Sequence, residues 1–138
     1  MKKFAKNAIL FVIGGFLYCL IEILLRGRTH WSMAIVGGIC FLLIGLYNEF
    51  VTYDTPLLKQ GIIGSCIVTS MEFVSGLILN IYLHWNVWDY SNLPFNFMGQ
   101  VCLPFSILWI FVSVLAVVVD DWLRYFLFHE KKPTYKLF

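Results

Sequence analysis

Two glutamates in apolar surroundings are the first residues that could do chemistry. Glu22 and Glu72 each interrupt a long hydrophobic run. A carboxylate in a membrane span costs roughly 2.5 to 3.5 kcal/mol on insertion scales, so it indicates a functional site with a partner nearby. Arg26 follows Glu22 by one helical turn, in the order that favours an ion pair, whereas Glu72 has no basic neighbour on its own predicted helix. We therefore expect Glu22 to stay ionised and Glu72 to exchange a proton or a cationic ligand.

A purely structural role is the alternative at both positions. An ion pair between Glu22 and Arg26 would lock one helix end, and Glu72 would make only a packing hydrogen bond. Four more polar residues, at the opposite helix ends, fit interface anchoring or interhelical hydrogen bonds: Asn48, Glu49, Asp120 and Asp121.

Aromatic residues gather beside the same helix ends as the two glutamates. Three tryptophans occur there with two histidines and an aspartate, namely Trp31, Trp85, Trp88, His30, His84 and Asp89. Aromatic belts are ordinary at membrane interfaces, but this composition above two carboxylates also fits a cage for a cation or a flat ring, with cation-π attraction of about 0.5 to 2 kcal/mol per contact. Arg26 and Arg28 leave an anion as the alternative ligand. The candidate ligand-binding residues are Tyr18, Glu22, Arg26, His30, Trp31, Glu72, Asn80, His84, Trp85, Trp88 and Asp89.

The composition identifies the medium in which these residues act. Hydrophobic residues make up 60% of the chain and charged residues 13%, with a mean hydropathy of +0.81, which is typical of an integral membrane protein. A helix needs about 20 residues to cross the bilayer core. Four such spans are predicted, at residues 8–25, 31–50, 57–83 and 98–119.

The order of the spans predicts an all-α, polytopic fold of two tandem helical hairpins in a single transmembrane domain, residues 1–138. An internal repeat supports this arrangement, because Gly14 precedes Glu22 by the same spacing with which Gly64 precedes Glu72. Two shorter matches accompany it: His30-Trp31 with His84-Trp85, and Gly37–Cys40 with Gly99–Cys102. Duplicated units of this kind occur among transporters.

Stripes of small and polar residues predict which helix faces meet. The first span carries Gly14, Tyr18, Glu22 and Arg26 at four-residue spacing, and the third carries Gly61, Ser65, Thr69, Glu72, Gly76 and Asn80. Such stripes face other helices in membrane proteins. Pro104 is expected to kink the fourth span.

The distribution of basic residues predicts the orientation. Eight of them lie at the ends that share one side, namely Lys2, Lys3, Lys6, Lys59, Arg124, Lys131, Lys132 and Lys136, against Arg26 and Arg28 on the other. The positive-inside rule therefore predicts a cell-membrane protein with both termini in the cytoplasm. The basic tails fit contact with anionic membrane lipid and make no case for nucleic acid.

Three polar segments resemble a known family. They are Glu22–Met33 (EILLRGRTHWSM), the pair Asn48-Glu49, and Trp88–Gln100 (WDYSNLPFNFMGQ). The chain from about Gly14 to Trp109 resembles the small bacterial membrane proteins named putative ABC-transporter type IV. The resemblance implies a permease that works with an ATPase. Because the chain has no G-x-x-x-x-G-K-[ST] loop, that ATPase would be a separate subunit.

Three classes of function follow. A transport protein or permease subunit that binds a small solute, cationic or aromatic, in an outer-facing cavity accounts for the carboxylates, the stripes and the repeat; a small proton-coupled exporter is one version. The alternative is a ligand-binding or regulatory membrane protein without transport. An intramembrane enzyme is less favoured, because no nucleophile-base pair or metal-ligand spacing occurs. We expect no catalytic residue, metal or cofactor, and assembly into a homo-oligomer is a further candidate state.

Overall fold

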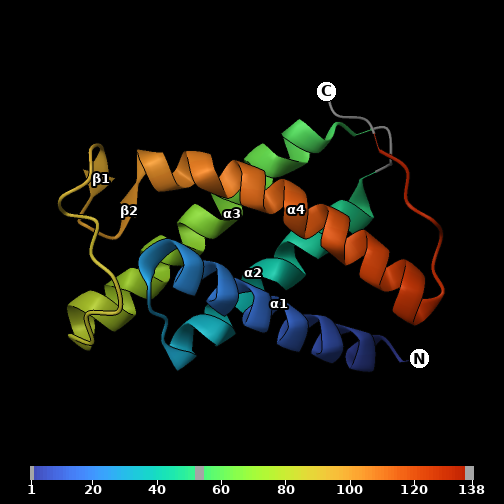
Figure 1. Ribbon diagram of the computed structural model, residues 1–138, viewed down its shortest axis with the longest axis horizontal. Coiled ribbons are helices and arrows are strands. Elements are labelled where there is room, and N and C mark those ends of the chain that lie inside the picture. The colour runs from blue at the N-terminus through green and yellow to red at the C-terminus, as the bar shows by residue number, and fades with distance from the viewer. Residues whose placement is uncertain (1, 52–54, 136–138) are drawn as a thin grey trace.

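Four long helices make up most of the protein in the computed structural model, which describes residues 2–51 and 55–135 (Figure 1). The helices are α1 (Lys3–Arg26), α2 (Trp31–Phe50), α3 (Leu57–Gly76) and α4 (Leu103–Phe128). A π-helix, η1 (Leu77–Tyr82), continues α3, and two short antiparallel strands, β1 (Asn96–Phe97) and β2 (Val101–Cys102), precede α4. Lys136, one of the basic residues counted above, lies outside the described residues.

The predicted all-α fold with four spans is confirmed. Four helical segments are long and apolar enough to cross a membrane, with α3 and η1 forming one of them, Leu57–Tyr82. Within the described residues the two strands are the only departure from helix, turn and loop. Because α1 packs mainly on α2, and α3 on α4, the helices form the two tandem hairpins expected from the sequence.

A glycine ends α1 and so fixes the position of Arg26. Gly27 has a φ of 78°, a left-handed conformation that costs glycine little, and its N–H donates to the Ile23 carbonyl oxygen at 2.9 Å. The helix stops there, and α2 begins only a few residues later, at Trp31. Arg26 therefore lies in the last turn of α1, one turn beyond Glu22.

The fourth helix differs from the prediction of 98–119. It starts later, at Leu103, because Met98 and Gly99 have φ values of 56° and 73° and form the turn between β1 and β2. Pro104 does not kink the helix as expected. It lies in the first turn, where a missing N–H breaks no intrahelical bond. The helix continues past the predicted end at residue 119 to Phe128, so it includes Asp120, Asp121 and the aromatic segment 122–128.

Small residues let the helices of each hairpin approach closely. A Cβ built on Gly15 would lie 2.4 Å from the Ala34 carbonyl oxygen of α2, and one on Gly64 would lie 2.5 Å from the Ser113 Cβ of α4. The polar stripe of α3 faces α4 as predicted, since the Ser65 hydroxyl donates to the Ser106 carbonyl oxygen at 2.5 Å.

The proposed repeat is only partly matched by structure. Gly14 and Gly64 occupy comparable places, because each lies against the second helix of its own hairpin, at Phe41 and Ser113 respectively. The Gly37 match is not equivalent, since Gly37 is helical whereas Gly99 is in a left-handed turn. The duplication stays a prediction.

The bundle has two distinct ends, visible in Figure 1. At the terminal end the first turns of α1 approach the end of α4, where the Lys6 Nζ lies 3.1 Å from Glu130 Oε2. At the opposite, loop end are the short α1–α2 connection, residues 27–30, and the long segment 83–102 that leads into α4. The basic count predicts that the terminal end faces the cytoplasm.

Candidate functional site

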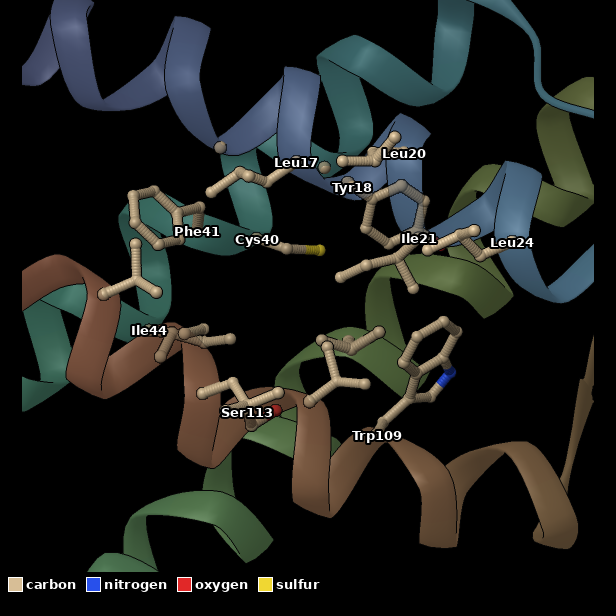
Figure 2. A pocket seen from close by; sticks show the side chains of 17 residues that line it. Leu17, Tyr18, Leu20, Ile21, Leu24, Cys40, Phe41, Ile44, Trp109 and Ser113 are labelled. Atoms are coloured by element: carbon tan, nitrogen blue, oxygen red, sulfur yellow. The ribbon is translucent and has the colours of Figure 1, made fainter.

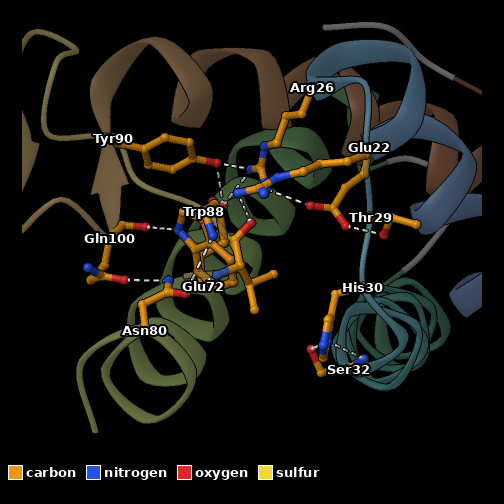
Figure 3. Close-up of polar contacts among 12 residues, drawn as sticks. Glu22, Arg26, Thr29, His30, Ser32, Glu72, Asn80, Trp88, Tyr90 and Gln100 are labelled. Atoms are coloured by element: carbon orange, nitrogen blue, oxygen red, sulfur yellow. Dashed lines mark hydrogen bonds and ion pairs between the residues drawn. The ribbon is translucent and has the colours of Figure 1, made fainter. Parts of the chain in front are cut away.

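One guanidinium joins the two glutamates at the loop end. Arg26 Nη1 lies 2.6 Å from Glu22 Oε2, and Arg26 Nη2 lies 3.3 Å from Glu72 Oε2 (Figure 3). Glu22 and Glu72 are 2% and 1% exposed, so both carboxylates are buried. The helices α1 and α3 thus bring the predicted pair together. The basic partner of Glu72 comes from another helix, α1, a contact that the pattern along α3 alone does not indicate.

Three further donors complete the coordination of the carboxylates. The Tyr90 hydroxyl donates to Glu72 Oε2 at 2.7 Å and also contacts Arg26, and the Trp109 indole N–H donates to Glu72 Oε1 at 2.5 Å. The Thr29 hydroxyl donates to Glu22 Oε1 at 2.7 Å. We call Glu22, Arg26, Thr29, Glu72, Tyr90 and Trp109 the loop-end network.

Aromatic rings enclose the guanidinium of Arg26. Its Cζ lies 5.1 Å from the centroids of both the Tyr90 and Phe105 rings and 5.8 Å from that of Trp88. These distances are in the range of cation-π contacts. Of the three tryptophans of the predicted ligand cage, only Trp88 is among these rings, and the cation that they surround is the chain's own arginine.

The other predicted cage residues form a separate surface cluster. The His30, Trp31 and Trp85 rings lie with centroids 5.4 to 5.8 Å apart, and Trp31 is 65% exposed. His30 also caps α2, because its Nδ1 accepts from the Ser32 N–H at 3.2 Å. This cluster lies at the loop end, and none of its side chains contacts the two carboxylates.

Asn80 and Trp88 hold the covering loop in place. Asn80 Nδ2 donates to Gln100 Oε1 at 2.8 Å, while Asn80 Oδ1 accepts the Val87 N–H at 2.7 Å. The Trp88 indole N–H donates to the Gln100 carbonyl oxygen at 2.9 Å. These bonds fix the segment that carries Tyr90 above Glu72.

Asp89 and His84 lie outside the loop-end network. Asp89 Oδ1 accepts the Ser91 N–H at 2.8 Å, and this hydrogen bond lowers the pKa of the exposed Asp89 carboxyl. His84 is exposed and has a φ of 57° in the turn after η1. Both residues shape the loop surface.

Tyr18 lies on an apolar cavity of about 250 Å³ that α1, α2 and α4 line together with Val68 of α3 (Figure 2). Its ring stacks on Trp109, with centroids 5.9 Å apart, and Trp109 also lines the cavity. Trp109 therefore touches both the cavity and, through its N–H, Glu72 of the loop-end network.

A second charged cluster occupies the terminal end. Arg124 Nε lies 3.1 Å from Asp120 Oδ2 and 3.4 Å from Glu49 Oε1. Asn48 Nδ2 donates to Asp121 Oδ1 at 2.5 Å, which is the interhelical hydrogen bond expected there. Carboxylate oxygens of Glu49, Asp120 and Asp121 lie within 4.8 Å of one another, a donor set that could hold a cation, but the arginine and the amide already occupy it.

Several members of the loop-end network were missing from the predicted site. Tyr90 follows Trp88 by two residues within the polar segment Trp88–Gln100, which was a signal for its involvement. Trp109 faces the same interior, but nothing in a single sequence distinguishes its indole from a packing residue. Thr29 lies in the polar segment Glu22–Met33, which was a signal of the same kind. Phe105, whose ring faces Arg26, is an apolar residue in a hydrophobic run and carried no signal.

Comparison with known proteins gives one match. A family model described as "Putative ABC-transporter type IV" matches residues 9–137. No curated protein and no solved structure matches the chain.

Proposed function

Since the chain belongs to the putative ABC-transporter type IV family and spans the membrane several times, we propose that it is the membrane-embedded subunit of a transport system that binds a small cationic solute at the loop-end network. Glu22, Glu72 and the enclosing aromatic rings would hold the cation, and Arg26 would compete with it for the same groups.

The observation that carries this proposal is the sharing of one guanidinium by two buried carboxylates. With both glutamates ionised, the group of three has one negative charge in excess. An unpaired charge is costly in a medium of low dielectric constant. A proton or a cationic ligand removes that cost, whereas an anion increases it.

The aromatic enclosure supports a cation for a second reason. The rings of Trp88, Tyr90 and Phe105 offer their faces to Arg26. Their attraction acts on any cation of similar size and shape, a ligand guanidinium or quaternary ammonium included. Arg26 then acts as a tethered occupant that a ligand displaces from the rings, while its pairing with Glu22 persists and the ligand balances the charge of Glu72.

Energy for transport would come from a partner. The chain has no phosphate-binding loop of the ATPase type, and its family name associates it with ABC transporters. We therefore propose a separate ATPase subunit, which would bind at the terminal end if that end faces the cytoplasm.

Rescue by free guanidinium tests the cation site. In Arg26→Ala the rings and carboxylates remain without their cation, so added guanidinium or methylguanidinium at millimolar concentration should raise the melting temperature of the purified variant, relative to equal sodium chloride. Arg124→Ala is the control, because Arg124 also pairs with carboxylates, those of Glu49, Asp120 and Glu130, but has no cage of three rings among the described residues. Equal rescue of both variants, or of neither, would contradict the proposal.

A second variant tests the charge argument without removing the cation. Glu72→Gln leaves Arg26 paired with Glu22 and cancels the excess negative charge. We expect a folded protein that binds benzyltrimethylammonium at least tenfold more weakly than wild type and without pH dependence, measured by calorimetry. Unchanged affinity and unchanged pH dependence would reduce Glu72 to a packing residue.

Ligand binding without transport is the competing function. It is favoured by the saturation of the loop-end network, in which each glutamate accepts at least two bonds and the site is closed over by Tyr90. Proteoliposomes with the purified chain separate the cases. Uptake of benzyltrimethylammonium driven by a pH gradient would support a proton-coupled transporter. Binding without uptake would leave two possibilities, a subunit that needs its ATPase and a regulatory protein. Uptake that appears only after the ATPase partner is added would identify the first of these.

A further inference from the structure

A polar pocket of about 470 Å³ lies at the terminal end of the bundle, where the start of α1 approaches the end of α4 (Figure 1). Three cationic side chains and one carboxylate line it, those of Lys3, Lys6, Arg124 and Glu49, together with the amide of Asn7. The pocket shares no residue with the loop-end network, which lies at the opposite end. An inference about its ligand therefore does not rest on the proposed cation site.

Two of the three cations in the pocket already have acidic partners. Lys6 Nζ lies 3.1 Å from Glu130 Oε2, and Arg124 Nε lies 3.1 Å from Oδ2 of the buried Asp120. Arg124 Nη1 also lies 3.8 Å from Glu130 Oε2, so the four groups form one chain of ion pairs. Their charges cancel, two positive and two negative, and leave none for a ligand to balance.

One charge of each sign remains in the lining, and the two are on different helices. Lys3 of α1 forms no ion pair with any described residue. The Glu49 side chain of α2 is 43% exposed, and its contact of 3.4 Å is to the same Arg124 nitrogen that Asp120 holds more closely. A ligand with a net negative charge is repelled by Glu49, and one with a net positive charge by Lys3. A ligand with one charge of each sign complements both.

The two helix ends have the same polarity as these side chains. The helix α1 begins at Lys3 with no acidic residue in its first turn, and α2 ends at Phe50 with no basic residue in its last turn. The start of a helix carries a partial positive charge and its end a partial negative charge. The α1 side of the pocket thus attracts an anionic group, and the α2 side attracts a cationic group.

Two apolar side chains place the pocket beside the bilayer. Leu46 and Phe50 of α2 belong to its lining and are 48% and 80% exposed. They lie in the last turns of a helix that is long and apolar enough to cross a membrane. Their exposed surfaces therefore lie close to the level at which lipid chains end and head groups begin.

We propose that this pocket binds the head group of a phospholipid that carries a phosphate and a primary ammonium group, as phosphatidylethanolamine does. The phosphate accepts hydrogen bonds from Lys3 and Asn7, the ammonium donates to Glu49, and the acyl chains pass over Leu46 and Phe50. A volume of about 470 Å³ is within the about 300 to 1,000 Å³ of small-molecule sites.

Native mass spectrometry of the purified protein tests the choice of lipid. The wild-type chain in detergent is offered equal amounts of phosphatidylethanolamine, phosphatidylcholine and phosphatidylglycerol with the same acyl chains. We expect the first to be retained up to about fivefold more than either of the others, the ratio for one partly exposed ion pair. Phosphatidylcholine has a quaternary ammonium that donates no hydrogen bond, and phosphatidylglycerol has no cation for Glu49.

A soluble head group distinguishes a lipid site from a site for a free solute. Glycerophosphoethanolamine has the same two charges as the lipid but no acyl chains. Because it cannot pack on Leu46 and Phe50, we expect it to displace phosphatidylethanolamine only weakly at equal concentration. Both competition experiments use only the wild-type chain.

Two substitutions should change the choice of lipid in different ways. Lys3→Gln removes the charge that attracts the phosphate, so binding of phosphatidylethanolamine and of phosphatidylglycerol should both fall. Glu49→Gln removes the charge that repels an anion, so phosphatidylethanolamine should bind less and phosphatidylglycerol more. Lys59→Gln is the matched control for Lys3 and should change neither, because Lys59 is exposed in the first turn of α3 and does not line the pocket.

Four outcomes would overturn the proposal. Equal retention of the three lipids by the wild type would show ordinary contact with bilayer lipid. A preference for phosphatidylglycerol that Glu49→Gln leaves unchanged would show attraction of any anionic lipid to a basic surface. Displacement by glycerophosphoethanolamine as strong as that by the whole lipid would identify a soluble ligand. An equal loss in Lys59→Gln and Lys3→Gln would place the lipid outside this pocket.

Discussion

Two arginines at opposite ends of the bundle have the same local pattern but different surroundings. Arg26 pairs with Glu22 and Arg124 with Asp120, each an acid four residues earlier, and each arginine also reaches a glutamate on another helix. Their side chains are 13% and 14% exposed.

The second glutamate distinguishes the two ends. The Glu72 side chain is 2% exposed beneath the ring of Tyr90, whereas that of Glu49 is 43% exposed. A charged group that water can reach is screened, so its ionised form costs little free energy. A charged group buried away from water needs an opposite charge or hydrogen bonds from the protein. The four-residue spacing of acid and arginine thus decides which ion pair forms. The burial by the covering loop decides how much that ion pair contributes to stability.

The largest difference between the two ends should be the side of the membrane on which each lies, because this difference is all or none. If the terminal end is cytoplasmic, a reporter that is active only outside the cytoplasm should give no signal when fused after Phe138, and a strong one when inserted after Asn92 in the loop-end segment. The reverse pair of signals would place the loop-end network in the cytoplasm and contradict the orientation.

Removing each arginine should destabilise the protein unequally. Arg26→Ala leaves two buried carboxylates without a counter-ion and should lower the free energy of unfolding by about 3 to 5 kcal/mol. Arg124→Ala should cost less, about 1 to 3 kcal/mol, because it strands one buried carboxylate, that of Asp120, instead of two, while Glu49 is hydrated. Denaturation in mixed micelles measures both. Equal losses for the two variants would mean that burial of Glu72 under the Tyr90 ring adds nothing to the stability of the ion pairs.

Tyr90→Phe measures what the Tyr90 hydroxyl contributes to stability while both ion pairs of Arg26 remain. The change keeps the ring over Arg26 but removes the hydroxyl that donates to Glu72. We expect a loss of about 1.5 to 3 kcal/mol in the free energy of unfolding, the range for a hydrogen bond to a charged group.

Tyr125→Phe is the control for that change. The Tyr125 ring packs on Trp122 and Phe126 near the terminal end, so loss of its hydroxyl should leave stability nearly unchanged. A comparable loss in both variants would show that the Tyr90 hydroxyl has no special role.

The smallest effect should be a pH dependence at Asp89. Its pKa is below the usual 3.8 because its carboxylate accepts the Ser91 N–H, so the unfolded chain binds the proton first as the pH falls. The stabilisation is complete well above pH 3.8 and is lost as the pH falls through the folded-state pKa. Asp89→Asn, which keeps an acceptor oxygen, should show a slightly flatter melting temperature between pH 5 and about pH 3. A melting temperature of Asp89→Asn that falls more steeply with pH than that of the wild type would contradict the lowered pKa of Asp89.

Sequence reasoning predicted the helices better than the contacts between them. Hydrophobic runs located all four spans, and the four-residue spacing identified the Glu22–Arg26 pair. The contact between Arg26 and Glu72 is set by how two hairpins pack, which a single sequence does not encode locally. The tryptophans were grouped as one cage because all lie near one end of the bundle, but backbone turns at residues 84–86 send Trp85 outward and Trp88 inward.

The start of α4 was missed for a different reason. From Phe95 to Phe105 the only strongly polar residues are Asn96 and Gln100, so hydropathy alone does not separate a strand pair from a helix. A left-handed turn at Met98 and Gly99 joins β1 to β2, and Pro104 lies in the first turn of α4, where a proline begins a helix instead of bending one.

The winding of the π-helix η1 determines the direction in which its side chains point at the loop end. A π-helical turn contains about one residue more than an α-helical turn, and such turns are frequent at functional sites. Asn80 lies within η1 and binds both Val87 and Gln100. If the same residues were wound as an α-helix, Asn80 would rotate out of register by up to one residue, roughly 100° around the axis. Its amide would then face another direction, so the anchorage of the whole loop over Glu72 is set by the winding of a single turn.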